Sequence, residues 1–200
     1  MSRKQLHVIY VPGLGDSNPS SQEKAVRAWR RFGIVPHLFQ MNWADKEDFA
    51  PKLERLLALI DELAADGKVS LVGASAGGGA VLNAFAQRKK VVSGVVTIAG
   101  KFDYPETVGV PVVRKNPAFV QSMAMVKTSR ASLDASDLQR IMSVYPIADE
   151  SVPVRESKLP GTVQKKVWVL GHIAIIAIMI SFRAGTMIRF LKSQAKVDVT

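Results

Sequence analysis

Short apolar segments rich in β-branched residues alternate along the chain with segments that have the composition or spacing of helices. A run of four to eight apolar residues that ends at Gly, Pro or a polar turn is typical of a buried strand. This pattern predicts extended segments at Leu6–Val11, Ile34–Trp43, Val69–Val72, Val91–Ile98, Arg140–Tyr145 and Lys166–Leu170.

The clearest helix lies between the second and third of these segments. Its apolar residues recur at three- and four-residue spacing, which places them on one face of a helix. We expect this helix to begin near Asp48, with Pro51 in its first turn, and to end near Gly67. Further helices are expected at Gln22–Arg31, Ala80–Arg88, Ala118–Val126, Ala135–Arg140 and from about Ile173 to Ser193.

Strands that alternate with helices at this spacing predict a parallel sheet covered by helices on both faces. The expected fold class is therefore α/β, a three-layer α/β/α sandwich with a mainly parallel sheet of about six strands. A single domain is expected over residues 1–200, because the length suits one hydrophobic core and no internal repeat or linker interrupts the pattern.

The segment Val167–Phe182 is unusually apolar and raises the question of a membrane span. It has 16 residues, fewer than the roughly 20 that a spanning helix needs, and Gly171-His172 interrupts it. We therefore expect a buried strand, a turn and a core-facing helix. Near the other end, the apolar run Val8–Val11 meets Pro12-Gly13 too soon for a signal-peptide core, so a cytoplasmic location is expected.

Composition restricts the chemistry. The chain has no cysteine, which excludes a thiol nucleophile, a disulfide, a thiolate zinc site and an iron–sulfur cluster, and leaves hydroxyl, imidazole and carboxylate groups. The 27 Lys and Arg against 17 Asp and Glu give a net charge of +10. These basic residues are dispersed in sequence and are not interleaved with aromatic residues, so no specific nucleic-acid partner is expected.

The sequence Gly73-Ala74-Ser75-Ala76-Gly77 matches the pattern G-x-S-x-G, after a predicted strand and before a predicted helix. In that context the serine occupies a tight, strained turn, and the small neighbours let strand and helix pack closely while the hydroxyl points outward. Ser75 is therefore the candidate nucleophile. The alternative is a glycine-rich turn that binds an anion at the helix N-terminus.

A serine hydroxyl needs a base to remove its proton, and a carboxylate to orient that base. Of the three histidines, His7 and His37 lie within extended segments and are expected to be structural. His172 follows the last predicted strand, at the carboxyl edge of the sheet where Ser75 also emerges. Asp149 follows the strand before it and is the candidate acid, with Glu150 and Asp103 as alternatives.

Two backbone N–H groups are candidates for an oxyanion hole, which stabilises the tetrahedral intermediate of acyl transfer. One belongs to Ala76, directly after Ser75. The other is expected from Leu14, in the glycine-containing loop after the first strand. A phosphate-binding role for that loop is disfavoured, because no glycine follows Gly15 at the required spacing and no Walker lysine is present.

The order Ser75, Asp149, His172 and the early Pro12-Gly13-Leu14-Gly15 loop resemble the α/β-hydrolase superfamily, specifically its small lidless serine hydrolases. The resemblance runs from the first strand to His172. It implies that Ser75 is acylated, that His172 acts as base and then as acid, and that Asp149 orients the imidazole. Many members have His-Gly in place of Pro12-Gly13, so a side chain that often braces the loop is missing.

No inserted cap domain is visible in the sequence, which implies an open, shallow site. Residues 101–126 would then form much of the acyl pocket wall. The alternative is that the apolar residues of this segment lie in the core; they are Phe102, Tyr104, Phe119, Met123 and Met125.

The sequence thus favours a serine hydrolase that cleaves a carboxylic ester or thioester of a small-molecule acyl substrate, with no metal and no organic cofactor. Two alternatives remain open. One is a noncatalytic binding protein with the same fold. The other is a membrane-peripheral lipid hydrolase whose apolar C-terminal segment makes weak contact with an anionic membrane surface.

Overall fold

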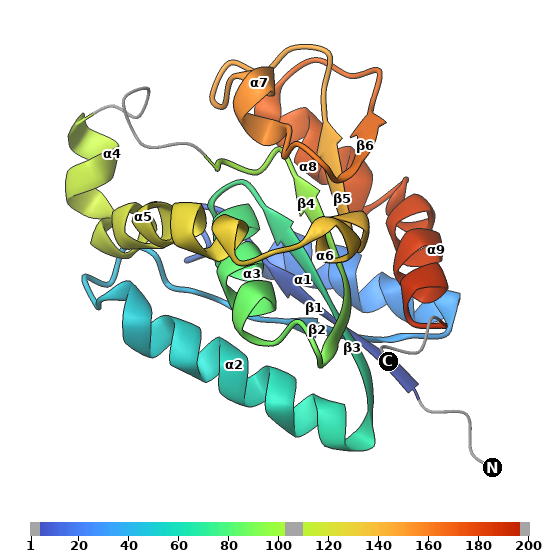
Figure 1. Ribbon diagram of the computed structural model, residues 1–200. Coiled ribbons are helices and arrows are strands. Elements are labelled where there is room, and N and C mark those ends of the chain that lie inside the picture. Colours follow the sequence, from blue (N-terminus) through green and yellow to red (C-terminus); the bar gives the residue numbers. More distant parts are fainter. Residues whose placement is uncertain (1–4, 103–109, 197–200) are drawn as a thin grey trace.

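Six parallel strands form one sheet in the computed structural model, which describes residues 5–102 and 110–196 (Figure 1). Their order across the sheet is β2-β1-β3-β4-β5-β6, and each neighbouring pair runs parallel. The strands are β1 (Gln5–Val11), β2 (Val35–Leu38), β3 (Gly67–Ala74), β4 (Val92–Ile98), β5 (Ile141–Tyr145) and β6 (Val163–Lys166).

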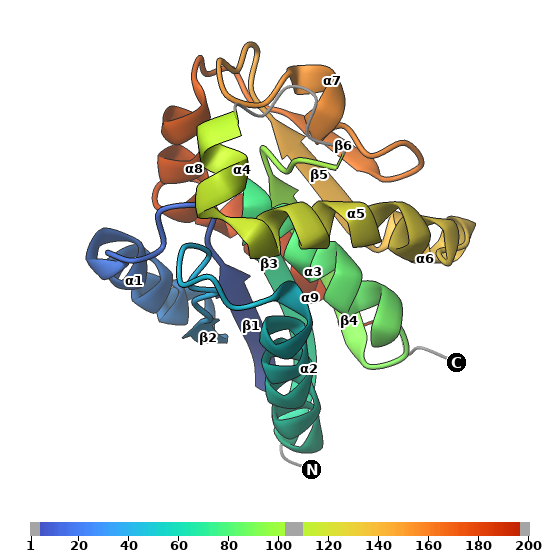
Figure 2. The same cartoon turned by 90° about the vertical axis from the view of Figure 1, so that its left-hand side faces the viewer.

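Helices cover both faces of the sheet, which confirms the expected α/β/α class. In Figure 1, α2 and α5 lie to the left of the sheet and α9 lies to its right, and Figure 2 shows α2, α3 and α5 in front of the sheet. The helices are α1 (Ser20–Arg27), a 3-10 helix at Ala28–Phe32, α2 (Phe49–Asp66), α3 (Ala76–Gln87), α4 (Val110–Lys115), α5 (Pro117–Ala131), α6 (Ala135–Gln139), α7 (Val154–Ser157), α8 (His172–Ile180) and α9 (Ala184–Gln194).

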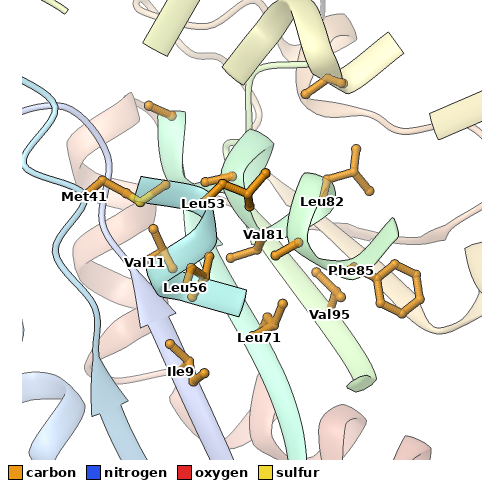
Figure 3. Close-up of a cluster of buried hydrophobic side chains, with 14 of the residues drawn as sticks. Ile9, Val11, Met41, Leu53, Leu56, Leu71, Val81, Leu82, Phe85 and Val95 are labelled. Carbon is orange, nitrogen blue, oxygen red and sulfur yellow. The ribbon is translucent and has the colours of Figure 1, made fainter. Parts of the chain in front are cut away.

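Each face of the sheet carries its own hydrophobic core. Figure 3 shows the core beneath α2 and α3, where Leu56 of α2 and Val81 of α3 lie near Leu71 of the central strand β3. The opposite core is formed by α1, the 3-10 helix, α8 and α9. The central strands β1, β3 and β4 are almost completely buried, as expected for strands that are covered on both faces.

Most predicted elements are present with shifted ends. The helix predicted near Asp48 to Gly67 is α2, and the segment Ile34–Trp43 shortens to β2. The helix predicted at Ala80 begins one turn earlier, at Ala76, and the one predicted at Ala118–Val126 continues to Ala131.

The strand predicted at Lys166–Leu170 is wrong. The edge strand β6 ends at Lys166, where the prediction begins, and only a single bridge joins Leu170 to Ala148. The apolar side chains that suggested a buried strand are on the surface, because Trp168 is 80% and Leu170 is 68% exposed.

The single long helix predicted from Ile173 to Ser193 is also wrong, because α8 and α9 meet at an angle of 65°. Two side chains of the 3-10 helix donate hydrogen bonds to backbone carbonyls at the bend between α8 and α9. The Trp29 Nε1–H donates to the Ile180 carbonyl at 2.7 Å, and the Arg31 guanidinium donates to the Ser181 carbonyl at 3.2 Å. These bonds satisfy carbonyls that a helix end leaves without an intrahelical partner.

In the described part of the chain, no single helix is long and apolar enough to cross a membrane; α8 and α9 meet that test only together, as a bent pair.

Since all strands run in the same direction, their carboxyl ends meet along one edge of the sheet. The segments that follow β1, β3, β5 and β6 begin at this edge. They carry the loop at Pro12–Asp16, Ser75, Asp149 and His172. The topology therefore places the candidate site residues at the end of the sheet where ligands bind in open α/β proteins.

Candidate active site

Ser75 occupies the one-residue turn between β3 and α3. Its backbone has φ 51° and ψ −119°, a region that residues other than glycine rarely adopt. Two backbone hydrogen bonds hold this conformation: the Ser75 N–H donates to the Ile98 carbonyl, and the Gly78 N–H donates to the Ser75 carbonyl, each at 2.9 Å. The turn thus lifts the side chain of Ser75 out of the sheet at its carboxyl edge.

The small residues beside Ser75 are required by the close approach of helix and strand. A Cβ atom at Gly77 would lie 2.1 Å from the Val11 carbonyl oxygen, and a Cβ at Gly73 would lie 2.3 Å from the Gly77 carbonyl oxygen. Neither distance is sterically allowed. The pattern G-x-S-x-G therefore has a packing explanation here, which is that only glycine lets α3 start directly against β1 and β3.

His172 is the first residue of α8, directly after Gly171, which has φ 95°. Its Nδ1 lies 2.8 Å from Oδ2 of Asp149. The other carboxylate oxygen of Asp149 accepts hydrogen bonds from the backbone N–H groups of Ser151 at 2.9 Å and Val152 at 2.8 Å. Both side chains are buried, that of Asp149 completely and that of His172 to 7% exposure.

This arrangement determines what the imidazole can do. A carboxylate at Nδ1 favours the tautomer with its proton on Nδ1, so Nε2 has a free lone pair and can accept a proton. Asp149 is itself held by two backbone donors and cannot rotate without losing them. The pair is thus an oriented base, the arrangement that a serine nucleophile needs.

The residues that the sequence offered as alternatives to Asp149 and His172 make other contacts. Glu150 accepts hydrogen bonds from the backbone N–H of His172, at 3.1 and 3.2 Å, and so contacts the start of α8. Asp103 lies outside the described residues. The rings of His7 and His37 contact each other across β1 and β2, with Nδ1 of His7 3.1 Å from Nε2 of His37.

Ser75 and His172 line the same cavity, which has a volume of about 430 Å³ and lies between α1 and α8. Its other walls come from the loop after β1, from α1 and from α8: Gly13, Leu14, Ser21, Gln22, Ala25, Ser151, Ile173, Ile176, Ala177, Ile180 and Ser181. None of these described lining residues carries a formal charge. The volume is in the range of small-molecule sites.

None of the described residues of the acyl pocket wall expected at 101–126, which are residues 101–102 and 110–126, lines this cavity. Phe119 packs in the core beneath α2 and α3, and Met125 packs against the same core. Phe102 and Met123 line a second cavity of about 700 Å³, whose lining includes neither Ser75 nor His172. Tyr104 lies outside the described residues.

The sequence analysis did not predict that α8 forms a wall of the Ser75 cavity, although the sequence contains a pattern that indicates it. Ile173, Ile176, Ala177 and Ile180 follow His172 at helical spacing, so one face of the helix that begins with His172 is necessarily apolar.

The two oxyanion-hole candidates lie beside Ser75. Ala76 is the first residue of α3, and an N–H in the first turn of a helix has no intrahelical partner. The loop after β1 passes directly against the serine, since a Cβ at Gly13 would lie 2.8 Å from Cβ and 3.3 Å from Oγ of Ser75. Leu14, the next residue, lines the cavity.

A buried carboxylate that the sequence did not point to fixes this loop. Asp16 accepts hydrogen bonds from the backbone N–H groups of Asn42 at 2.7 Å and Trp43 at 3.3 Å. The Trp43 Nε1–H in turn donates to the Pro12 carbonyl at 3.2 Å. Burial raises the pKa of Asp16, and the backbone hydrogen bonds oppose that rise. The loop that carries Leu14 is therefore tied to the segment after β2 at both of its ends.

Among the described residues, no group of three or more His, Asp or Glu side chains could hold a metal ion.

No protein-family model and no curated protein matches the chain. Solved structures do match it over nearly its whole length. One is reported with LipS and LipT, two metagenome-derived lipolytic enzymes, at 12% identity and a TM-score of 0.68, covering 96% of this chain and 95% of the other.

A second match comes from a study of carboxylesterases of the ammonia-oxidizing thaumarchaeon Nitrososphaera gargenis, at 13% identity and a TM-score of 0.68, covering 95% and 92% of the two chains. A third is MGS-MChE2, an alpha/beta hydrolase enzyme from a sediment metagenome of the lagoon of Mar Chica, Morocco. It has 16% identity and a TM-score of 0.62, covering 96% and 93%. At these identities the similarity is one of fold.

Proposed function

We propose that this chain, which has the α/β-hydrolase fold, hydrolyses carboxylic esters through an acyl-enzyme formed on Ser75. One observation carries the proposal. Ser75 stands on a strained turn and lines the same cavity as His172, whose imidazole is held by the buried carboxylate of Asp149 at 2.8 Å. A strained non-glycine residue in the same cavity as an oriented base is an arrangement that structural roles do not require.

The reaction has two balanced steps. In the first, Oγ of Ser75 attacks the ester carbonyl carbon while Nε2 of His172 takes the hydroxyl proton, and that proton then goes to the departing alcohol. In the second, His172 takes a proton from water, the resulting hydroxide attacks the acyl carbon, and the proton returns to Ser75. The backbone N–H groups of Leu14 and Ala76 stabilise the oxyanion in both steps.

The cavity suggests an uncharged substrate with an apolar group. Its described lining carries no formal charge, and the face contributed by α8 is entirely aliphatic beyond His172. A carboxylate or ammonium group on the substrate would lose its hydration there without gaining a partner. Esters or thioesters with aliphatic chains fit this lining. The similar structures include those reported with lipolytic enzymes and with carboxylesterases, which agrees with this substrate class.

Hydrolysis of p-nitrophenyl esters, from acetate to laurate, tests the proposal. Wild-type protein should hydrolyse them with a kcat/KM that rises by up to about fourfold for each methylene seated in the cavity. Ser75→Ala should lower kcat/KM by about a thousandfold or more.

Ser193→Ala is the matched control, because its hydroxyl is exposed on α9 and bonds only locally, to the Phe190 carbonyl. It should retain full activity. Turnover by folded Ser75→Ala at the wild-type rate, or no turnover of any ester by folded wild type, would exclude the proposed function.

A further inference from the structure

Two exposed apolar side chains line the Ser75 cavity, and four more lie on the chain segments that lead into or out of its lining. Seven large apolar residues are exposed in the described part of the chain, and only Val112, on α4, has no link to this region. The other six form what we call the apolar rim: Leu14, Ile147, Trp168, Leu170, Ile173 and Phe182. Leu14 and Ile173 line the cavity itself, and the Ile147 N–H donates to the Val169 carbonyl at 3.0 Å, between Trp168 and Leu170.

The apolar rim is unusual for a protein surface. Trp168 is 80% and Phe182 is 88% exposed, whereas the other two tryptophans, Trp29 and Trp43, are fully buried. These side chains bracket α8 at its two ends, and Ile173 lies on its first turn. Single exposed apolar residues need no explanation, but a group around one opening marks an interaction surface.

The part of the chain that carries four of the six rim residues is basic. Residues 157–197 contain seven Lys and Arg and no Asp or Glu. Within this stretch, Nζ of Lys166 lies 5.0 Å from the centre of the Trp168 ring, and Arg183 directly follows Phe182. The carboxylates nearest in sequence to Ile147, those of Asp149 and Glu150, are engaged with His172 by hydrogen bonds.

We propose that the apolar rim docks on an anionic phospholipid surface and turns the opening of the Ser75 cavity toward the lipid. Apolar side chains next to lysines and arginines suit the boundary between acyl chains and anionic headgroups. A second copy of the chain is a poorer occupant, because self-association would bring two stretches of the same positive charge together. The docking does not depend on catalysis. The corollary that the substrate is an acyl lipid taken from the surface rests on the proposed function.

The dimensions indicate shallow contact. The helix α8 has nine residues, about 13 Å in length, and its inner side packs on the sheet through Ile175 and Met179. Only the residues of the rim and the outer side of α8 are available to enter the headgroup region. The core therefore stays intact when the protein docks.

Trp168 provides the direct test. Inactive Ser75→Ala protein is mixed with phosphatidylcholine vesicles that contain about one third phosphatidylglycerol. Co-sedimentation should occur together with a blue shift of tryptophan emission, and lipids with brominated acyl chains should quench that emission. Since Trp29 and Trp43 are buried, the change is assigned to Trp168. Trp168→Phe should still sediment with the vesicles and show no blue shift.

Variants separate the apolar contribution to vesicle binding from the electrostatic contribution. Trp168→Ser/Phe182→Ser should weaken vesicle binding by at least about tenfold, and Val112→Ser on distant α4 (Figure 1) should leave it unchanged. Lys166→Gln should weaken binding about fivefold, whereas Lys90→Gln, at the amino edge of the sheet before β4, should not. Raising NaCl from about 0.1 M to about 0.5 M should also weaken binding.

Three results would overturn the inference. They are no binding to anionic vesicles, binding that neither Trp168→Ser/Phe182→Ser nor Lys166→Gln weakens, and a concentration-dependent dimer that Trp168→Ser/Phe182→Ser dissociates in protein that does not bind vesicles. Because the vesicle experiments use Ser75→Ala, their failure is separate from failure of the proposed function, which ester hydrolysis by wild type reports.

Discussion

At the scale of single residues, the two oxygens of Asp149 have separate tasks. Oδ2 faces Nδ1 of His172, and Oδ1 accepts the N–H groups of Ser151 and Val152. The loop after β5 therefore folds around the same carboxylate that orients the imidazole. Glu150, one residue later, bonds only to the backbone of His172. Adjacent carboxylates thus fix the ring and the peptide of one histidine.

Asp149→Asn should lower kcat for ester hydrolysis by about ten thousandfold. Asparagine retains an oxygen for the two backbone donors, so the loop can persist, but its NH₂ group would face Nδ1 of His172. The imidazole would then carry its proton on Nε2 and could not accept one from Ser75. Steady-state kinetics and circular dichroism should show lost activity in a folded protein.

Glu150→Gln is the matched control for this prediction. Its amide oxygen can still accept the His172 N–H, so we expect kcat within about threefold of wild type, because a neutral hydrogen bond replaces a charge-assisted one. Activity lost in Glu150→Gln and kept in Asp149→Asn would assign the acid to Glu150.

At the scale of elements, the start of α3 packs closely against the end of β1. Its four small residues before Ala80 let the helix begin against β1, and the glycines among them are not equivalent. A Cβ at Gly77 would lie 2.1 Å from the Val11 carbonyl oxygen, whereas the nearest atoms to a Cβ at Gly79 would be side-chain atoms of Ser122 and Val126 at 3.4 Å, with the Lys101 carbonyl oxygen at 3.6 Å. The motif glycine is required by backbone contact, and Gly79 is not.

Gly77→Ala should therefore lower the free energy of unfolding by about 3 kcal/mol or more, because strand and helix must separate. Gly79→Ala should leave it unchanged or raise it by up to about 1 kcal/mol, through the better helix propensity of alanine. Urea denaturation of both variants measures the difference. Equal losses of stability would contradict the packing described for the elbow.

The short helix α6 contains a buried carboxylate that joins the two ends of this helix to the turn between α3 and β4. Asp137 accepts hydrogen bonds from Nζ of Lys89 at 2.9 Å and from the Arg140 guanidinium at 2.6 Å, and it completes a capping box with Asp134. Burial alone would raise the pKa of Asp137, but the hydrogen bonds from Lys89 and Arg140 outweigh burial and hold the pKa below its usual value.

A carboxylate with a lowered pKa stabilises the fold above its unfolded-state pKa of about 4, and this contribution is lost as pH falls toward the folded-state pKa. Asp137→Asn should thus cost about 1–3 kcal/mol at pH 7 and less at pH 3, where the wild-type contribution has diminished. Urea midpoints at the two pH values test this. A cost that stays the same at both would show that the charge of Asp137 does not matter.

The sequence predicted correctly the strands that are buried on both faces of the sheet. It predicted wrongly a strand in an apolar segment that lies on the surface. The strands β1, β3 and β4 are apolar because helices cover both faces, so apolar runs identified them. The run at Val167–Leu170 is also apolar, but Trp168 and Leu170 are exposed, and hydrophobicity alone cannot distinguish a core segment from an apolar surface. The break after Ile180 depends on Trp29, a contact between residues 151 positions apart.

At the scale of the whole molecule, the parallel topology was the predictable part of the site. Because β3 and β5 were identified, Ser75 and Asp149 had to follow strand ends at one edge of the sheet, and His172 also lies at this edge although the strand predicted before it was wrong. The cavity wall was not predictable in the same way. Which side of α8 faces α1 depends on the bend between α8 and α9, and Asp16 fixes the loop of Leu14 through residues after β2. Such contacts between distant segments leave no local pattern in a single sequence.

The central claim is that Ser75 is an activated nucleophile, and covalent labelling with a fluorophosphonate probe tests it most directly, because this reagent reports an activated serine without knowledge of the substrate. We predict one adduct per chain, located by peptide mass spectrometry on Ser75, absent from Ser75→Ala and strongly slowed in Asp149→Asn. Folded wild-type protein that stays unlabelled, or carries the adduct on another serine, would contradict the account.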